Sequence, residues 1–337
     1  MASADTPNGG LAKSFGFIGL GIMGLGMAKN LRAKIPTDAV LNICEVNKPR
    51  RDEFVASKTG DIRIADSPRE IAEKSVRDII ITMLPRGEHV REVFTNPQTG
   101  LLSVASSAKP GSKVFMDCST IDVKTSQEVA AAVEASGLGL FADAPVSGGQ
   151  GGANAGTLTF MVGGSSEAFE GVKPTLELMG KPENLFHCGK AGAGLVTKLI
   201  NNYLSAVNMI GVCEGMNMGR LYGLDPVLLA SAINSSTGMS RNSREQNPVK
   251  GVSSVASSAK DFEGGFSTEL CRGVLHMAME LGEQLGAKSL LAPVVRDMYD
   301  TAIQNDKCSG KDFRSIYRLF AEDDGNQLSL GNAKAQK

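Results

Sequence analysis

Short apolar runs alternate with amphipathic stretches through the first half of the chain. The apolar runs are nearly continuous, which is typical of strands in a sheet that is covered on both faces. Between them, residues 22–33 predict an amphipathic helix directly after the first strand. This alternation predicts an α/β fold, a Rossmann-type doubly wound parallel sheet. The predicted strands lie at residues 15–20, 40–46, 78–84, 114–116, 138–142 and 158–162.

The pattern changes near residue 189, after which no run is typical of a strand. Residues 193–222 carry apolar side chains at mostly helical spacing and predict one long helix. Gly223 suits the end of this helix, and Asp225-Pro226 suits the cap and first turn of the next one. Further helices are expected at residues 226–234, 268–285 and 292–306. We therefore predict an all-α C-terminal domain.

These patterns divide the chain into four segments. Residues 1–13 have neither a long apolar core nor an Arg-rich amphipathic face, so we expect a disordered leader and no signal or transit peptide. Residues 14–190 form the predicted Rossmann domain, and residues 191–324 form the predicted helical domain. Residues 325–337 lack apolar periodicity, which predicts a disordered tail.

Charge and hydropathy exclude several classes of partner. Lys and Arg number 35 and Asp and Glu number 36, so the net charge is -1. Such a balance argues against nucleic-acid binding and against a polybasic membrane anchor. Transmembrane helices need about 18 or more apolar residues in a row, and no such run occurs. We expect no nucleic-acid partner, no membrane partner and a cytoplasmic location.

Cysteine and histidine positions argue against a metal site or a disulfide framework. The six cysteines are scattered without a CxxC pair, and the three histidines form no HExxH motif. We expect reduced and mostly buried thiols. The cysteines are Cys44, Cys118, Cys188, Cys213, Cys271 and Cys308.

A glycine-rich turn between the first predicted strand and helix has the GxGxxG spacing. The first glycine permits a tight turn, the second lets a pyrophosphate approach the backbone, and the third lets the helix pack on the sheet. Backbone N–H groups and the helix dipole then favour an anion. Strand, turn and helix together predict a dinucleotide cofactor bound by Gly19, Leu20, Gly21, Ile22, Met23 and Gly24.

Glu45 stands 21 residues beyond Gly24, at the end of the second predicted strand. A carboxylate there accepts hydrogen bonds from ribose hydroxyls and repels a 2′-phosphate, which favours NAD over NADP. Arg50 and Arg51 follow closely and are long enough to reach a 2′-phosphate. We interpret both arginines as part of a solvated helix start, so NAD is the predicted cofactor and NADP the alternative.

Lys198 and Asn202 are four residues apart on the long predicted helix, so both project from one face. Lys198 falls near the junction of the two predicted domains, where an active-site cleft is expected. A desolvated lysine has a pKa closer to neutrality and is suited to proton transfer. Asn202 is suited to hold a hydroxyl or a carbonyl group, although a solvated surface role remains the alternative for Lys198.

Two polar segments follow predicted strands at the edge where ligands bind in open α/β sheets. Asp117-Cys118-Ser119-Thr120 follows the fourth strand, and Asp143 opens a longer segment after the fifth. That segment contains Ser147-Gly148-Gly149, and successive N–H groups in such a turn form an anion-binding concavity. A small carboxylate is therefore the expected ligand.

Taken together, these segments resemble the β-hydroxyacid dehydrogenase family, and among its members the 3-hydroxyisobutyrate dehydrogenases. The resemblance spans roughly residues 15–320. It depends on the order of the motifs, which is more specific than any one of them. The motifs are GFIGLGIMGLGMAKNL from residue 15, MLP at 83–85, DCST at 117–120, DAPVSGGQGGANAGTLTFMVGG from 143, GAGLVTKLINN from 192, GLDP at 223–226 and GGF at 264–266.

The resemblance implies an NAD-dependent oxidation of a small 3-hydroxy acid to its semialdehyde. It implies that Lys198 is the catalytic general acid and base, with Asn202 as its partner. Ser119, or the turn Ser147-Gly148-Gly149, would hold the substrate carboxylate, and the helical domain would make the contacts of a homodimer or homotetramer. Leu84, Pro85 and Thr120 would contact the cofactor. Family members are often mitochondrial, which is the alternative to the cytoplasm.

The chain departs from the family pattern at two places. Family dehydrogenases usually carry a Lys-Asp pair after GGF, and Gly273-Val274 stands in its place here. Arg272 is about 100° away around the helix and does not substitute for that lysine. His89 replaces a cofactor-contacting asparagine. The missing pair leaves a bulkier substrate or a non-catalytic dinucleotide-binding scaffold as alternatives. An NADPH-dependent semialdehyde or glyoxylate reductase of the same fold is a further alternative, although such members tend to have Asn-Arg where Glu45-Val46 stands here.

Overall fold

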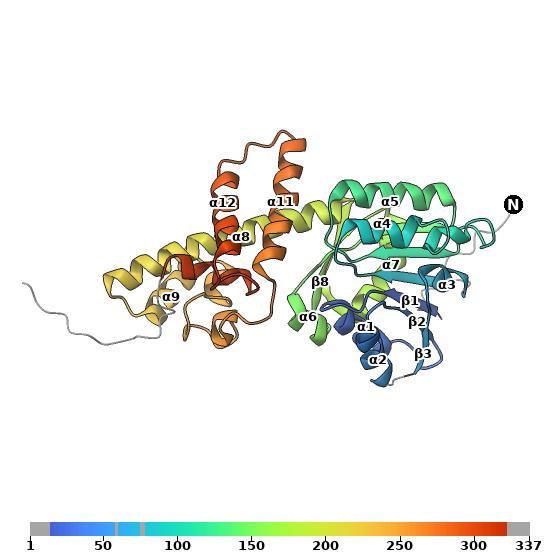
Figure 1. The fold of residues 1–337 in the computed structure, drawn as a ribbon, viewed down its shortest axis with the longest axis horizontal. Helices are drawn as coiled ribbons and strands as arrows, with labels where there is room; N and C mark the ends of the chain where they lie inside the picture. The colour runs from blue at the N-terminus through green and yellow to red at the C-terminus, as the bar shows by residue number, and fades with distance from the viewer. Residues whose placement is uncertain (1–13, 58–59, 75–77, 322–337) are drawn as a thin grey trace, which may run out of the picture. The chain divides into compact units, whose positions relative to one another are not determined.

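The chain separates into two compact units, Met1–Lys198 and Leu199–Lys337. The computed structural model describes residues 14–57, 60–74 and 78–321 (Figure 1). The predicted leader at residues 1–13 and the predicted tail at 325–337 lie outside the described residues.

In the part of the first unit that the structure describes, nine strands form one sheet, in the order β3-β2-β1-β4-β5-β6-β8-β7, with β9 paired to β8. Strands β1 to β6 are parallel, as the sequence predicts. The sheet departs from the predicted parallel arrangement at one end, where β8 runs antiparallel to β6 and β7. The strands are β1 (Ser14–Ile18), β2 (Val40–Cys44), β3 (Asp61–Ile64), β4 (Asp78–Thr82), β5 (Lys113–Asp117), β6 (Gly139–Asp143), β7 (Val146–Ser147), β8 (Leu158–Gly163) and β9 (Gly180–Gly189).

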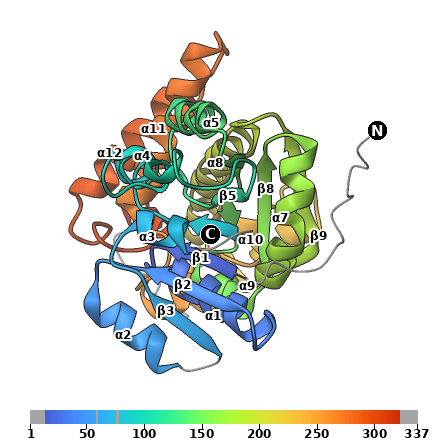
Figure 2. The ribbon, with the colours of Figure 1, turned by 90° about the vertical axis from the view of Figure 1, so that its right-hand side faces the viewer.

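Helices cover both faces of this sheet, and alternate strand residues supply a separate core to each face. On β4, Ile79 and Ile81 join the core beneath α1, α2, α6 and α7, whereas Ile80 joins the core beneath α3, α4 and α5 (Figure 2). This double burial explains the continuous apolar runs. The helices are α1 (Gly24–Lys34), α2 (Lys48–Ala56), α3 (Pro68–Glu73), α4 (Gly87–Thr95), α5 (Val123–Ser136), α6 (Gly149–Ala155) and α7 (Ser166–Met179), with a 3₁₀ turn, η1, at Leu101–Val104.

Among its described residues the second unit has helices and 3₁₀ turns but no strand, as predicted, apart from an isolated β-bridge between Ser267 and Asp312. α8 (Ala193–Tyr222) has the predicted bounds, begins in the first unit and continues into the second. Its buried side chains Ala206, Met209 and Cys213 pack in the core of the second unit. The other elements are α9 (Pro226–Asn234), α10 (Arg241–Arg244), α11 (Thr268–Gln284) and α12 (Ala292–Gln304), with 3₁₀ turns η2 (Ser257–Lys260) and η3 (Phe313–Leu319).

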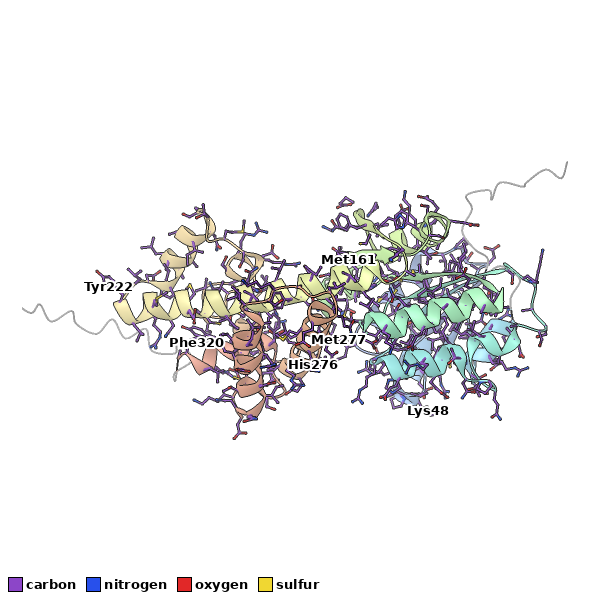
Figure 3. The ribbon with its side chains drawn as sticks, turned by 90° about the horizontal axis from the view of Figure 1, so that it is seen from above. Lys48, Met161, Tyr222, His276, Met277 and Phe320 are labelled. Carbon is purple, nitrogen blue, oxygen red and sulfur yellow. The ribbon has the colours of Figure 1, made fainter. Side chains whose placement is uncertain are left out.

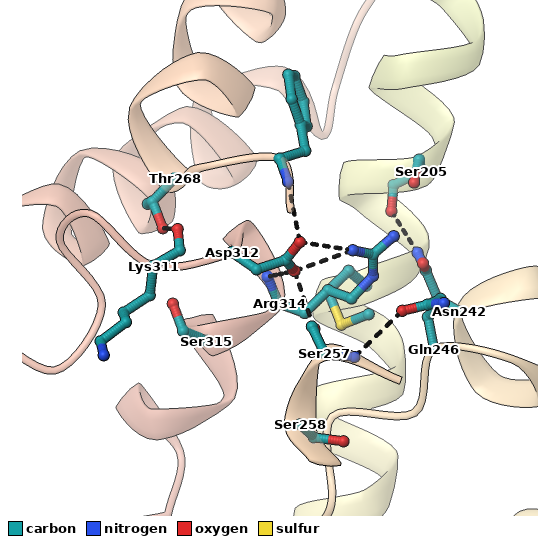
Figure 4. A network of polar contacts seen from close by, with 12 residues as sticks. Ser205, Asn242, Gln246, Ser257, Ser258, Thr268, Lys311, Asp312, Arg314 and Ser315 are labelled. Atoms are coloured by element: carbon teal, nitrogen blue, oxygen red, sulfur yellow. Dashed lines mark hydrogen bonds and ion pairs between the residues drawn. The ribbon is translucent and has the colours of Figure 1, made fainter. Parts of the chain in front are cut away.

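A buried carboxylate joins three loops of the second unit. Asp312 is 1% exposed and accepts hydrogen bonds from the Ser257 hydroxyl and the Phe266 backbone N–H (Figure 4). It also forms two 2.9 Å contacts with the Arg314 guanidinium. Gly265 has φ +74°, and a Cβ added there would lie 2.3 Å from the Asp312 carboxylate. The GGF motif therefore has a packing role in this unit.

Candidate active site

The glycine-rich turn lies where the order of the sheet reverses, between β1 and β4. In open α/β sheets this switch point is where ligands bind. The Met83 N–H after β4 donates to the Ile18 carbonyl of β1 at 2.9 Å. Gly19 has φ +94°, and an added Cβ would lie 2.4 Å from the Met83 carbonyl oxygen. Only glycine fits this position, because both the backbone angle and the space exclude a side chain.

The three glycines of the motif differ in whether the surrounding structure leaves room for a side chain. A Cβ at Gly24 would lie 2.0 Å from the Gly19 carbonyl oxygen, so the chain itself requires glycine there. A Cβ at Gly21 would meet nothing within 4 Å. Within the described chain no side chain caps α1 at Met23, and its first turn holds no acidic residue. Open space at Gly21 and an uncapped helix N-terminus fit an anionic group such as a pyrophosphate.

Glu45 follows β2 rather than ending it, because the strand stops at Cys44. Its carboxylate accepts hydrogen bonds from the Leu20 N–H and from the Asn47 N–H, at 2.5 and 2.6 Å. The Arg50 guanidinium lies 3.5 Å from the Leu20 carbonyl oxygen. A carboxylate and a guanidinium therefore both lie beside the glycine-rich turn. Arg50 belongs to the first turn of α2, as the helix-start interpretation predicts.

Ser119 links the ends of β4 and β5 and is fully buried. Its hydroxyl donates to the Asp117 carboxylate at 2.6 Å and accepts from the Leu84 N–H at 2.8 Å. The Thr82 hydroxyl donates to the same Asp117 oxygen at 2.7 Å. The hydroxyl of Ser119 is thus already engaged within the chain. The predicted cofactor contacts Leu84, Pro85 and Thr120 lie on either side of this link.

Burial raises the pKa of Asp117 to about 6, although hydrogen bonds from Ser119 and Thr82 oppose the shift. A second carboxylate, Asp143, adds to the shift from the neighbouring strand, where it is the register partner of Asp117. The other oxygen of Asp117 is buried without a hydrogen-bond partner among the described residues. A proton on this carboxyl is therefore held more tightly than on an ordinary aspartic acid.

The turn Ser147-Gly148-Gly149 connects β7 to α6. Gly148 and Gly149 have φ +135° and +63°, which L side chains rarely adopt. Both glycines are exposed and Ser147 is half-buried, so a ligand has access to this backbone from solvent. The turn therefore has the exposed backbone that an anion-binding concavity requires.

Lys198 is 8% exposed and lies six residues into α8. Among the described residues, no hydrogen bond or ion pair involves its ammonium group. Burial lowers the pKa of Lys198 to about 8, and no neighbouring carboxylate compensates for the desolvation. A lysine without an ion pair in such a position exchanges its proton near neutral pH. Asn202 is one turn further along α8, and its side-chain carbonyl accepts from the Asn201 amide at 3.2 Å.

The two departures from the family pattern lie on helices. Gly273 is on α11, where an added Cβ would meet nothing within 4 Å, and it lines a cavity of about 490 Å³ with Arg272 and Asp300. Arg272, the neighbouring cation, is paired with Asp300 at 2.8 Å. His89 is exposed in the first turn of α4.

Two classes of feature are absent from the described part of the chain. It contains no group of three or more His, Cys, Asp or Glu side chains that could hold a metal ion. None of its helices combines the length and apolarity needed to cross a membrane. Five of the cysteines are buried and Cys188 is half-buried.

Family models match both halves of the chain. The NAD-binding domain of 6-phosphogluconate dehydrogenase matches residues 14–190, and the model described as NAD-binding of NADP-dependent 3-hydroxyisobutyrate dehydrogenase matches residues 192–320. Mitochondrial 3-hydroxyisobutyrate dehydrogenase of Mus musculus is 39% identical over 92% of this chain and 87% of its own. NAD-dependent L-serine dehydrogenase of Pseudomonas aeruginosa is 36% identical over 91% of this chain and 98% of its own.

A solved structure extends the agreement to the fold. The Mycobacterium tuberculosis 3-hydroxyisobutyrate dehydrogenase with L-serine has a TM-score of 0.80 and 32% identity, over 91% of this chain and 99% of that one. Both halves of the chain have an NAD(P)-binding description, and the relatives are oxidoreductases that act on CH–OH groups. The chain therefore belongs to the β-hydroxyacid dehydrogenase family and is a hydroxyacid dehydrogenase similar to 3-hydroxyisobutyrate dehydrogenase.

Proposed function

We propose that this protein oxidises a small 3-hydroxy acid to its semialdehyde with NAD, and that Lys198 is the general acid and base. The observation that carries the proposal is the buried Lys198 side chain, which has no ion pair and a pKa of about 8. A general base works best when its pKa is close to the operating pH. An ordinary surface lysine is almost entirely protonated there.

The nicotinamide cofactor, when bound, supplies the hydride acceptor. Neutral Lys198 accepts the proton of the substrate hydroxyl through Nζ as the C–H hydride departs, so that the C–O bond becomes a carbonyl. In the reverse direction the Lys198 ammonium returns that proton to the developing alkoxide. Asn202, one turn further along α8, is proposed to orient the hydroxyl group beside the lysine.

The remaining predicted contacts divide between cofactor and substrate. The turn of residues 19–24, together with Glu45, Leu84, Pro85 and Thr120, is proposed to hold the dinucleotide. The turn Ser147-Gly148-Gly149 is proposed to bind the substrate carboxylate, because its glycines are exposed. Ser119 is the weaker candidate for that carboxylate, because its buried hydroxyl is already bonded to Asp117 and Leu84.

NAD is the proposed cofactor because Glu45 lies beside the glycine-rich turn, where its negative charge opposes a 2′-phosphate. Two substrates follow from the relatives, which are named for 3-hydroxyisobutyrate and for L-serine. Both molecules carry a carboxylate and a hydroxyl on carbon 3. A homo-oligomer and a cytoplasmic location remain predictions from the sequence.

The test is formation of NADH from NAD, or of NADPH from NADP, by wild-type protein and by Lys198→Ala, with 3-hydroxyisobutyrate, 3-hydroxypropionate and L-serine as substrates. We expect turnover in the wild type and a loss of about 10²-fold or more in the variant, the scale of general acid–base catalysis. NAD affinity, measured by isothermal titration calorimetry, should be unchanged. Lys181→Ala, at an exposed position of β9, is the matched control. Near-normal turnover of Lys198→Ala would remove Lys198 from the mechanism.

A further inference from the structure

We propose that Asp143 is a positioning residue for Lys198: its buried carboxylate holds the first turn of α8 and thereby sets where the lysine lies. This inference extends the proposed function, since it concerns the same lysine. It assigns a role to the first residue of the DAPVSGG segment. Sequence reasoning gave that residue no role of its own.

The carboxylate of Asp143 is fully buried at the end of β6 and caps the N-terminus of α8. One oxygen accepts from the Gly192 N–H at 2.7 Å, and the other accepts from the Leu195 N–H at 2.9 Å. The Gly194 N–H adds to this set. Helix N-termini leave N–H groups without intrahelical partners, and a carboxylate satisfies them and also interacts favourably with the helix dipole.

The backbone around this cap has no room for a side chain. A Cβ at Gly194 would lie 2.2 Å from the Met161 carbonyl oxygen and 2.8 Å from the Asp143 carboxylate. A Cβ at Gly163, at the end of β8, would lie 2.4 Å from the same carboxylate. Gly192 has φ +91°. Met161 accordingly lies beside the start of α8 (Figure 3).

Lys198 is three residues beyond Leu195, so it lies one helical turn from a capped N–H. Leu195 is itself fully buried in the core beneath α3, α4 and α5, which fixes the rotation of that turn. The carboxylate acts through position rather than charge, because burial alone accounts for the shift in the pKa of Lys198. Because the first turn of α8 is held by the Asp143 carboxylate and by the buried Leu195 side chain, the Lys198 side chain stays in its buried position.

The experiment compares Asp143→Asn and Gly194→Ala with wild type. In Asp143→Asn the amide nitrogen would face an N–H donor, so at least one cap bond is lost. Gly194→Ala keeps the Asp143 carboxylate but displaces it, because the new Cβ would lie 2.8 Å from that carboxylate and 2.2 Å from the Met161 carbonyl oxygen. Asp312→Asn is the matched control, because Asp312 is equally buried and also accepts backbone N–H groups, but in the second unit. Circular dichroism and melting temperature establish that each variant is folded.

The first readout is the pH dependence of Lys198 acetylation by trace acetic anhydride, followed by mass spectrometry. It needs neither substrate nor turnover. In both junction variants we expect the midpoint to rise by at least one pH unit from about 8, toward that of an ordinary lysine. We also expect kcat to fall at least tenfold, with NAD affinity within twofold of wild type. In Asp312→Asn the midpoint should not move, even if the melting temperature falls.

The outcomes separate this inference from the proposed function. Folded junction variants with a wild-type labelling midpoint would overturn the positioning role. If Asp143→Asn does not fold, Gly194→Ala decides on the same readouts. A shifted midpoint together with near-normal turnover of Lys198→Ala would leave the positioning role standing and reject the proposed function.

Discussion

The carboxylate of Glu45 accepts a hydrogen bond from the backbone N–H of Leu20, which ties the segment after β2 to the glycine-rich turn after β1. Its other oxygen accepts from the Asn47 N–H at the start of α2. A side chain expected only to contact a ribose therefore also holds the turn that is proposed to bind the pyrophosphate. Glu45 is thus expected to affect both the strength and the selectivity of cofactor binding.

Replacing Glu45 with Ala should weaken NAD binding at least tenfold. Hydrogen bonds to charged groups contribute about 1.5–3 kcal/mol, and this substitution removes them. NADP binding should weaken less, because repulsion of the 2′-phosphate is lost at the same time. Isothermal titration calorimetry with both cofactors measures the change in the ratio of the two affinities, and Glu53→Ala, at an exposed residue paired with Lys29, serves as control. If the ratio of NAD affinity to NADP affinity does not change, the selectivity proposed for Glu45 is contradicted.

The two directions of the reaction should depend on pH in opposite ways. Oxidation needs neutral Lys198, so kcat/KM should rise about tenfold per pH unit at low pH and level off above about 8. Reduction of the semialdehyde needs the ammonium form, so its kcat/KM should fall above the same value. Initial rates from pH 6 to 10 test this. Parallel profiles in the two directions would show that another group controls the proton.

Lys198→Met should make the protein more stable at neutral pH. The pKa of Lys198 is lowered to about 8 from 10.5, so the charged Lys198 side chain destabilises the folded state at pH values below that range. The contribution of a neutral Lys198 to wild-type stability is fully present above the unfolded pKa of 10.5 and is lost as the pH falls through the folded pKa of about 8. The advantage of Lys198→Met should be roughly 3 kcal/mol at pH 7 and about 1 kcal/mol smaller at pH 9. Urea unfolding at both pH values measures it, and a destabilised variant would indicate that the ammonium has a compensating partner.

Asp117 should show the opposite dependence. Its pKa is raised to about 6 from 3.8, so the stability it contributes is present below the unfolded pKa and is lost as pH rises through about 6. The free energy of unfolding of Asp117→Asn, measured relative to that of wild type, should therefore increase by about 1 kcal/mol from pH 5 to pH 7. Urea unfolding of both proteins at the two pH values gives this difference. A constant difference would mean that the carboxyl titrates normally.

The wild-type protein should be a homo-oligomer. In the second unit, Met218, Leu221 and Tyr222 at the end of α8 and Leu228 on α9 are each at least 66% exposed, and Figure 3 labels Tyr222 there. Clustered exposed apolar side chains are typical of protein interfaces. Light scattering should give a multiple of 35.3 kDa, and Leu221→Glu should lower it. A monomeric wild type at micromolar concentration would contradict the prediction.

The sequence predicted the elements whose side chains are buried on a regular period. α8 and α9 have the predicted bounds, and the parallel strands β1, β2, β4, β5 and β6 were found from their apolar runs. β3 and β9 were missed, because β3 is an edge strand of sequence DIRI and only the first residue of β9 is buried. Neither strand carries the apolar continuity that a doubly covered position imposes.

Candidate chemistry was harder to predict, because hydrogen-bond partners far apart in sequence decide it. Spacing placed Lys198 on a helix, but its burial depends on packing that no local pattern reveals. Ser119 is predicted to hold the substrate carboxylate, but no spacing in the sequence reveals that its hydroxyl joins Asp117 to Leu84. The cap formed by Asp143 joins residues about 50 positions apart, and only the folded backbone brings them together.

Helices α1 and α6 pack directly against each other. α1 follows the glycine-rich turn, and α6 follows the turn Ser147-Gly148-Gly149. Asn30 on α1 donates to the Ala153 carbonyl oxygen of α6 at 2.8 Å, and a Cβ at Gly26 would lie 2.5 Å from the Asn154 side chain. We therefore expect the two proposed binding turns to move together. A fixed order of binding, cofactor before substrate, would have to arise from direct contact between the two ligands rather than from a conformational signal between the turns.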